Sequence, residues 1–374
     1  MKKRIYLDTA AGMNNPSSIH REGMQARKRL EEARSAVARF LGVHPDEIIF
    51  TSGGTESNNL AIMGTGHRVL KMPQHPVSGV ITSVIEHPSI LNACIKLEGE
   101  GEKISYLPVN FDGLIDSKIL AEKLKPETRL VTLHYANSEI GVVQPVAEIA
   151  KVIRKHRKKY STQLPYFHLD VCQAVRFFDL NVAKLGVDLL TINGGKIYGP
   201  EGSGVLYVKR GIKLKPMFAG GGQENGRRSG TENLWAIEGL AKALTLCEKL
   251  RDKETVRLTK LRDYFIAQLL KIPNTVLNGS ASARAPHNIN VSFLGADSEY
   301  VVLALDAKGV ACSSGSACSA RSESASYVLK SLGASDARAQ SAIRFTLARA
   351  TTKSDLDYVL KILPEIIARG RQQF

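Results

Sequence analysis

Apolar residues recur along the chain with two alternating periods, and together these predict an α/β fold. From residue 21 to residue 41 they recur at steps of four and three, which predicts an amphipathic helix closed by Gly42. Short apolar or β-branched runs predict strands at 5–8, 79–83, 104–107, 130–134, 166–170 and 189–193, with helical stretches such as 88–97 and 146–156 between them. This alternation is typical of a large, mostly parallel sheet with helices on both faces.

The pattern changes in the last third of the chain. Two successive helices are predicted, one after Asn233 and one around 258–269, with a domain boundary near Asp252. Residues 289–293 alternate between apolar and polar, which predicts a half-buried strand, and 343–346 form a second strand. A final helix begins at Thr352 with Asp355 as its capping partner. We therefore predict a large domain at 13–252 and a smaller α+β domain made of 1–12 and 253–374.

Length and composition are those of an ordinary soluble globular protein. The chain has 374 residues, 43% of them apolar and 23% charged, which allows two domains and a large core. No apolar run approaches the roughly 20 residues of a membrane span, and the start reads as a strand and not as a signal peptide, so we expect a cytoplasmic protein. The five cysteines are too few and too scattered to predict a disulfide framework or a metal site.

The charge balance is strongly basic. The chain has 51 basic and 36 acidic residues, a net charge of +15, which favours anionic ligands or partners. The densest basic run, 154–159, ends a predicted helix and has no interleaved aromatic residues. We interpret it as a solvated helix end in preference to a nucleic-acid site, and an acidic protein partner stays open.

One lysine lies between two predicted strands in the stretch 188–208. Lys196 follows Gly194 and Gly195 and precedes a Tyr-Gly-Pro turn. A strand that ends in such a turn presents its amine at the mouth of a sheet, where burial lowers the pKa of the amine and favours a Schiff base. The alternative is a surface lysine on a hairpin.

Other candidate residues also follow predicted strands. The stretch 47–59 is a strand, a Gly-Gly-Thr turn and a helix start, which makes a seat for an anion, although its spacing is not that of a nucleotide-triphosphate loop. Ligands of parallel sheets bind beyond the carboxyl ends of the strands. If Lys196 binds a carbonyl cofactor as an imine, Asp170 suits the protonated ring nitrogen of that cofactor; the alternative is that Asp170 is a helix cap. His87 suits stacking on the cofactor ring and proton transfer; the alternative is a capping or core histidine.

Several stretches together carry a family resemblance. They are TSGGTESNN, IEHPSI, ANSEIGVVQP, HLDVCQAV, GGKIYGPEGSGVLYV, GGGQENGRRSGTEN, SSGSACS and IRFTLAR, in this order along nearly the whole chain. The chain resembles the cysteine desulfurases of the NifS/IscS-like group, pyridoxal 5'-phosphate (PLP) enzymes of the aspartate aminotransferase type I fold. This resemblance implies the same fold, cofactor and reaction.

The resemblance also implies roles for individual residues. Lys196 would hold the cofactor aldehyde and Cys318 would be the nucleophile on a mobile loop that takes sulfur from L-cysteine and leaves L-alanine. Cys312 is either buried filler or a second sulfur acceptor. Around the cofactor ring, Asp170 would bind the ring nitrogen, Gln173 and Asn137 would lie near the ring hydroxyl, and His87 would stack on the ring face and assist proton transfer. Gly54 and Thr55 would bind the cofactor phosphate, and Thr231 would bind the phosphate in a neighbouring subunit. Arg344, helped by Asn15, would bind the substrate carboxylate.

The role of Thr231 implies a homodimer. The length of the loop around Cys318 resembles the group that passes sulfur to a cluster scaffold, so the implied acceptor is a scaffold protein for iron-sulfur clusters or a tRNA-thiolation protein. We expect no membrane to take part in the reaction.

Two departures from the family pattern stand out. The family usually has Ser-Gly-His-Lys where this chain has Asn193, Gly194, Gly195 and Lys196. One lost charge-assisted hydrogen bond costs about 1.5 to 3 kcal/mol of phosphate binding, and whether Asn193 or a basic side chain from elsewhere compensates stays open. Near the start, a family loop and helix are missing, so the motifs LDTAAG and NPSS are nearly fused.

Two rival functions remain at this point. One is a selenocysteine lyase or another PLP-dependent β-lyase on the same fold. The other is a degenerate, non-catalytic binding partner, suggested by Gly195 and the shortened start. The joint presence of Lys196, Asp170, His87, Arg344 and Cys318 argues against the degenerate partner.

Overall fold

A seven-stranded sheet forms the centre of the molecule. The computed structural model describes residues 4–65, 79–315 and 326–372. The strand order is β1-β7-β6-β5-β4-β2-β3, and β7 alone runs antiparallel to its neighbours. The strands are β1 (Ile48–Thr51), β2 (Gly79–Ser83), β3 (Lys103–Leu107), β4 (Thr128–His134), β5 (Tyr166–Asp170), β6 (Leu189–Asn193) and β7 (Gly204–Val208). The predicted α/β architecture is confirmed.

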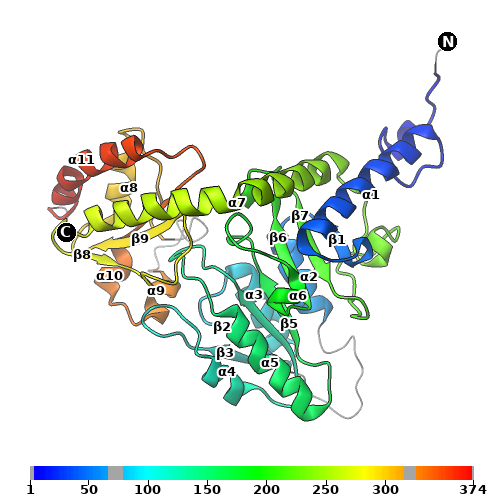
Figure 1. The fold of residues 1–374 in the computed structure, drawn as a ribbon, viewed down its shortest axis with the longest axis horizontal. Helices are drawn as coiled ribbons and strands as arrows, with labels where there is room; N and C mark the ends of the chain where they lie inside the picture. The colour runs from blue at the N-terminus through cyan, green and yellow to red at the C-terminus, as the bar shows by residue number, and fades with distance from the viewer. Residues whose placement is uncertain (1–3, 66–78, 316–325, 373–374) are drawn as a thin grey trace.

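Helices cover both faces of this sheet (Figure 1). One face packs against α1, α5 and the first half of α7, and the other packs against α2 and α3. The helices are α1 (Arg21–Leu41), α2 (Gly54–Gly64), α3 (Pro88–Gly99), α4 (Ser117–Lys123), α5 (Val146–Tyr160), α6 (Val182–Leu185), α7 (Leu234–Leu269), α8 (Ser298–Asp306), α9 (Tyr327–Ser331), α10 (Asp336–Gln340) and α11 (Lys353–Gly370). None of these described helices is long and apolar enough to cross a membrane.

Helix α7 is a single helix of 36 residues, so the prediction of two successive helices was wrong. No residue between Cys247 and Leu258 is buried, and this polar stretch interrupted the apolar period without breaking the helix. The first half of α7 packs on the large sheet and the second half on the small one. Asp252 lies inside the helix, and the division of the chain into 13–252 against 1–12 and 253–374 stays a prediction.

A second, antiparallel sheet has the order β10-β9-β8, formed by β8 (Thr275–Leu277), β9 (Asn288–Phe293) and β10 (Ala342–Thr346). The prediction that β9 is half-buried was wrong, because all six of its residues are buried. Its polar side chains are bonded inside the protein: the amide of Asn290 donates to the Glu139 carbonyl, and the hydroxyl of Ser292 donates to the Arg338 carbonyl. Buried polar residues with partners thus gave the same alternation as a solvated face.

The strand predicted at 5–8 is absent, because this segment pairs with no other strand of the described structure. Residues 4–20, the N-terminal arm, project from the start of α1 (Figure 1). Arg4 pairs with Glu22, and Asp8 accepts from His20. The polar side of the arm is therefore fastened to α1, whereas Leu7 and Ile19 are both 92% exposed.

Candidate active site

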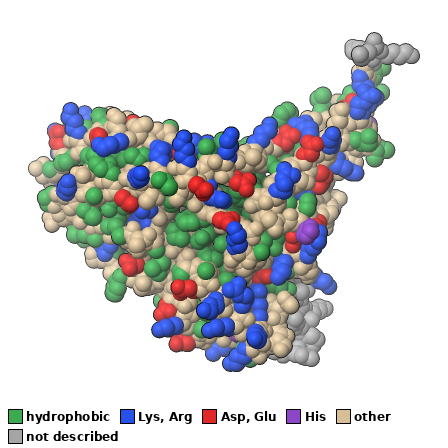
Figure 2. Space-filling model, viewed as in Figure 1, with side chains coloured by type: hydrophobic (Ala, Val, Ile, Leu, Met, Phe, Trp, Pro, Cys, Tyr) green, Lys and Arg blue, Asp and Glu red, His purple; other side chains and the backbone are tan. Residues whose placement is uncertain are grey.

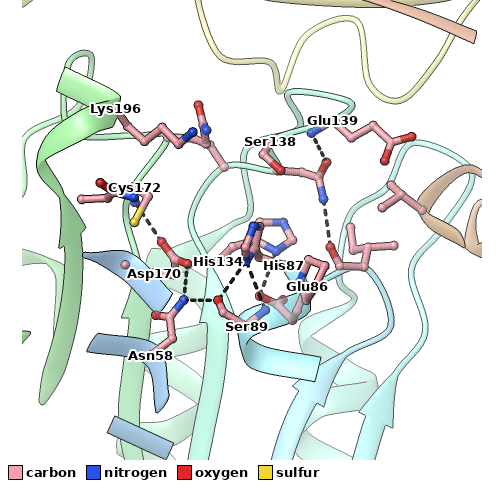
Figure 3. A pocket seen from close by; sticks show the side chains of 18 of the residues that line it. Asn58, Glu86, His87, Ser89, His134, Ser138, Glu139, Asp170, Cys172 and Lys196 are labelled. Atoms are coloured by element: carbon pink, nitrogen blue, oxygen red, sulfur yellow. Dashed lines mark hydrogen bonds and ion pairs between the residues drawn. The ribbon is translucent and has the colours of Figure 1, made fainter. Parts of the chain in front are cut away.

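A pocket opens at the carboxyl ends of β2, β4, β5 and β6, where the sequence placed the candidate residues (Figure 3). The predicted site residues among its lining are Gly54, Thr55, His87, Asn137, Asp170, Gln173, Asn193, Lys196 and Arg344. Asn15 and Thr231 do not line it: Asn15 belongs to the N-terminal arm, and Thr231 lines a separate hollow beside Arg228. Cys318 lies outside the described residues.

Asp170 forms the floor of the pocket. It ends β5 and is buried, and its Oδ1 accepts from the Cys172 backbone N–H at 2.9 Å while its Oδ2 accepts from the Asn58 amide at 2.7 Å. In the sheet Asp170 pairs with His134 of β4 on one side and with Thr191 of β6 on the other. A carboxylate fixed by two donors in this way presents a set direction to a cationic ring nitrogen.

His87 caps α3, as one of its two sequence interpretations required, and also lines the pocket. Its Nδ1 lies 2.8 Å from the Ser89 hydroxyl and accepts from the Ser89 backbone N–H at 3.2 Å. Burial lowers the pKa of His87 below its ordinary value, although the carboxylate of Asp170 opposes this. The imidazole therefore favours its neutral form.

Lys196 lies on a short 3₁₀ helix, Gly194–Ile197, directly after β6. Asn193 caps this turn, because its Oδ1 accepts from the Gly195 backbone N–H at 3.0 Å. Lys196 lines the pocket but is exposed, so the burial expected from the sequence is not found in this chain. The reason is that the turn that carries Lys196 lies at the rim, beyond Ile192, the last buried residue of β6.

The start of α2 provides an anion seat beside that turn. Gly54 is the first residue of α2, and a Cβ at this position would come within 3.0 Å of the Cys172 sulfur and 3.5 Å of the Asn193 amide nitrogen. Since Asn193 uses its oxygen on the turn, its amide nitrogen remains beside the free backbone donors of α2. Gly195 provides no side chain here.

The opposite wall comes from β10 and from the segment after β4. The guanidinium of Arg344 donates to the Ser138 carbonyl at 3.2 Å, and its backbone bonds to Ser313 in both directions. The Asn137 amide donates to the Ile85 carbonyl at 2.9 Å, and its oxygen accepts from the Glu139 and Ile140 backbone N–H groups. Asn137 is thus held firmly at the edge of the pocket.

Three of the lining residues that sequence reasoning missed are Glu86, His134 and His287. Glu86 is fully buried and pairs with His134 at 2.9 Å, directly beside His87. His287 lies against Gln173, with 3.3 Å between its Nε2 and the amide oxygen, and burial lowers its pKa to about 3. A signal existed for His134, since it ends a predicted strand as Asp170 does, but none existed for His287, which lies two residues before the predicted strand at 289–293.

Comparisons with known proteins agree with this geometry. The model of the class-V aminotransferase family matches residues 3–359. Cysteine desulfurase IscS of Dictyoglomus turgidum is 43% identical, covering 99% of this chain and 96% of the relative, and that of Methanosarcina thermophila is 40% identical, covering 99% and 93%. The chain belongs to the cysteine desulfurases of the class-V aminotransferase family.

Solved structures agree as well. A NifS-like protein is 31% identical with a TM-score of 0.86 and covers 95% of this chain and 92% of its own. The NifS-like protein of Rickettsia africae is also 31% identical, with a TM-score of 0.82 and the same coverage. The predicted fold of PLP enzymes is confirmed, and cysteine desulfurases of this family depend on PLP.

The pocket fits this cofactor. A buried carboxylate at Asp170 suits the ring nitrogen, His87 offers a flat ring face, and Lys196 offers an amine at the rim. The start of α2 and the Asn193 amide suit the phosphate. Among the described residues no group of His, Cys, Asp and Glu is arranged to hold a metal ion.

The four described cysteines are all poor nucleophiles. Burial raises the pKa of Cys94 to about 12 and that of Cys312 to about 11. Burial also raises the pKa values of Cys172 and Cys247, the former well above the usual range. Since only a thiolate attacks sulfur, none of these four thiols is activated by its surroundings.

Proposed function

We propose that this pocket converts L-cysteine to L-alanine and leaves the sulfur as a persulfide on Cys318. The reaction balances without an oxidant: an S–S bond forms between Cys318 and the substrate sulfur, the Cβ–S bond breaks, and its electron pair stays with Cβ, which takes up a proton. The observation that carries the proposal is the presence of Lys196, Asp170, His87 and Arg344 in one pocket.

Each of these residues has a chemical task there. Bound PLP supplies a ring that accepts electrons and so stabilises negative charge on the substrate. Asp170 provides the negative charge that keeps a ring nitrogen protonated, and Arg344 binds the substrate carboxylate. The Lys196 amine takes the α proton as general base and delivers it again, and His87 holds its own proton beside the same space.

The ends of the segment that holds Cys318 support its role. Residues 316–325 are preceded by Ser313, whose carbonyl accepts from the Arg344 backbone N–H at 2.7 Å. They are followed by Ser326, whose hydroxyl donates to Glu139, and by Tyr327, which lines the pocket. The described residues on both sides of this segment are therefore bonded to residues that line the pocket, Arg344 and Glu139.

Variants separate this reaction from its rivals. We expect the purified protein to form alanine from L-cysteine, and Lys196→Ala to abolish both this activity and the visible absorption of the bound cofactor. Cys318→Ser keeps the absorption and loses alanine formation, while Cys312→Ser, the matched control, keeps both. Alanine formation that survives Cys318→Ser would instead indicate a lyase that needs no nucleophile, and a protein that binds no PLP would indicate the degenerate partner.

We also propose that the chain works as a homodimer. The N-terminal arm carries Ile5, Leu7, Met13 and Ile19, each more than two thirds exposed, and Figure 2 shows apolar side chains along it. Monomeric proteins rarely expose apolar groups in such a cluster, so a partner surface is expected. Thr231 is exposed and lies away from its own chain's pocket, which suits a residue that serves a neighbouring subunit.

Sedimentation measures the assembly directly. The wild-type protein is expected at the mass of a dimer, and the double variant Leu7→Asp, Ile19→Asp at a lower average mass. Phe111→Asp changes an apolar residue that is 84% exposed outside the arm, so it should leave the dimer intact. A monomeric wild-type protein would refute the homodimer.

The sulfur acceptor that we propose is a cytoplasmic protein of iron-sulfur cluster assembly or of tRNA thiolation. The exposed Lys and Arg residues over α5, visible in Figure 2, favour an acceptor with an acidic surface. Transfer of radioactive sulfur from the Cys318 persulfide to a purified scaffold protein tests the cluster branch. Transfer to a tRNA-thiolation carrier only would decide for the other branch.

A further inference from the structure

A buried chain of hydrogen bonds connects Asp170 to His87 (Figure 3). The amide nitrogen of Asn58 lies 2.7 Å from Asp170 Oδ2 and 2.9 Å from the Ser89 hydroxyl. The same hydroxyl lies 2.8 Å from His87 Nδ1. Asn58, Ser89 and Asp170 are all buried, so water does not compete for these bonds. The two residues that flank the ring site are thus connected through two residues that sequence reasoning did not assign.

In this series of hydrogen bonds, the direction of each bond determines which group donates in the next. An ionised carboxylate only accepts, so Asn58 must turn its NH₂ group towards Asp170. The second hydrogen of that group goes to Ser89, whose oxygen therefore accepts. The single proton of the Ser89 hydroxyl is then left for His87 Nδ1, and the Ser89 backbone N–H donates to the same nitrogen at 3.2 Å. A nitrogen that accepts from two donors holds no proton of its own.

We propose that Asn58 and Ser89 are positioning residues that hold His87 as the neutral tautomer protonated at Nε2. His87 consequently enters the reaction as a hydrogen-bond donor through Nε2 and not as a base. The tautomer follows from the hydrogen bonds alone, whereas its consequence for turnover rests on the proposed function. Asn58 also fixes the second oxygen of Asp170, so a single amide sets the orientation of both groups.

The surroundings of His87 favour a neutral ring. Burial is the largest influence and lowers its pKa, Asp170 and Glu86 raise it, and Lys196 and His134 lower it. Protonation at Nδ1 would in addition break both hydrogen bonds from Ser89. Loss of the Asn58 amide frees the Ser89 hydroxyl to rotate and to accept, which weakens the preference between the two ring nitrogens and leaves only the Ser89 backbone N–H to favour an unprotonated Nδ1.

Nitrogen NMR of the full chain labelled with [¹⁵N]histidine reads the tautomer directly, with His87 identified by comparison with His87→Gln. The wild-type spectrum at pH 7 to 8 is expected to show an unprotonated Nδ1 and a protonated Nε2. In Asn58→Ala and Ser89→Ala the two signals move towards each other as the tautomers mix. Asn59→Ala is the matched control, since this neighbouring amide bonds only to backbone carbonyls, and it should leave both signals in place.

A pH profile connects the tautomer to turnover. With the Ser89 hydroxyl no longer held as a donor to Nδ1, the acidic limb of kcat/KM for alanine formation is expected to move up by about half a pH unit or more in Asn58→Ala, and to stay in place in Asn59→Ala. A protonated Nδ1 in the wild-type protein, or an Asn58→Ala spectrum identical to wild type in a folded variant, would overturn the assignment. The expected tautomer in a protein that forms no alanine would instead overturn the proposed function and leave the assignment standing.

Discussion

The floor and the rim of the pocket are built differently. The floor consists of Asp170, Asn58, Ser89 and the Glu86–His134 pair, all buried and joined to one another or to backbone groups. The rim consists of exposed positions: Lys196, Thr55 and the bare Gly195. The floor residues are held by buried contacts before any ligand binds, whereas the rim presents its groups to the ligand.

The physical chemistry of burial explains the difference. A buried polar group without a partner costs about 1 to 3 kcal/mol, which favours bonded polar residues at the floor. Two atoms there, the Oδ1 of Asn58 and the Nε2 of His134, have no hydrogen-bond partner in the described structure. Bonding at the floor fixes direction, which suits recognition of a ring. A lysine that must exchange partners during turnover cannot be bound so firmly, and exposure keeps it free to move.

The largest effect is expected at the floor, from Asp170→Asn. The amide keeps the shape and an acceptor for Asn58, but it removes the negative charge that stabilises a protonated ring nitrogen. We expect kcat/KM for alanine formation to fall by about two to four orders of magnitude. The control is Asp179→Asn, an exposed carboxylate paired with Lys184, which should have wild-type kinetics. Near-normal kinetics in Asp170→Asn would show that the floor does not act through its charge.

The second largest effect is expected on the free energy of unfolding, which should depend on pH through a histidine buried in the sheet. His168 is fully buried on β5 between Thr132 and Thr191, and burial lowers its pKa to about 4. An unfolded histidine takes up a proton near pH 6.5, so the stability that neutral His168 retains above this pH is lost as the pH falls towards 4. Between pH 7.5 and 5 this loss amounts to roughly 2 kcal/mol.

Urea unfolding at several pH values measures this loss. The variant His168→Gln keeps groups that bond to Thr132 and Thr191 but does not titrate, so its stability should depend less on pH over this range. The matched control is His44→Gln, which changes an exposed histidine outside the sheet core. An equal dependence on pH in His168→Gln and wild type would contradict the assignment.

These two regions also differ in how well the sequence predicts them. The strands β4, β5 and β6 are short apolar runs. Residues at or just after their carboxyl ends, Asp170 and Lys196 among them, lie at the pocket as expected. The hydrogen bonds of the floor could not be predicted, because Asn58 bonds to residues that lie 31 and 112 positions away in the sequence. Such contacts depend on how helices and strands pack, and no local pattern encodes them.

Misleading local patterns explain the other errors. The alternation in β9 indicated a solvated face, yet its polar side chains bond inside the protein. The short apolar run at 5–8 indicated a strand, yet a strand needs a neighbouring edge, and this segment projects away from both sheets. In both cases the local residue pattern does not show which groups the segment will contact in the folded protein.

The third effect concerns the wall at Arg344. Arg344→Lys keeps the positive charge but loses the planar pair of donors that suits a carboxylate. We expect KM for L-cysteine to rise about tenfold or more, with a smaller change in kcat. Arg369→Lys on the surface of α11, where Arg369 pairs with Glu365, is the control and should change neither constant. An unchanged KM in Arg344→Lys would place the carboxylate elsewhere.

The smallest effect is expected from filling the rim with Gly195→His. The backbone of Gly195 does not require glycine, because its φ is not positive, and a Cβ there would lie 3.5 Å from Glu201 and 3.6 Å from Asn193. An imidazole beside the start of α2 adds one donor for the phosphate, worth about a tenfold gain in PLP affinity because the position is exposed. Titration of the apoprotein with PLP measures this, and Gly99→His, at an open position at the end of α3, is the control. Equal affinity in Gly195→His and wild type would mean that Asn193 and the helix start already saturate the phosphate, and that the rim needs no further donor.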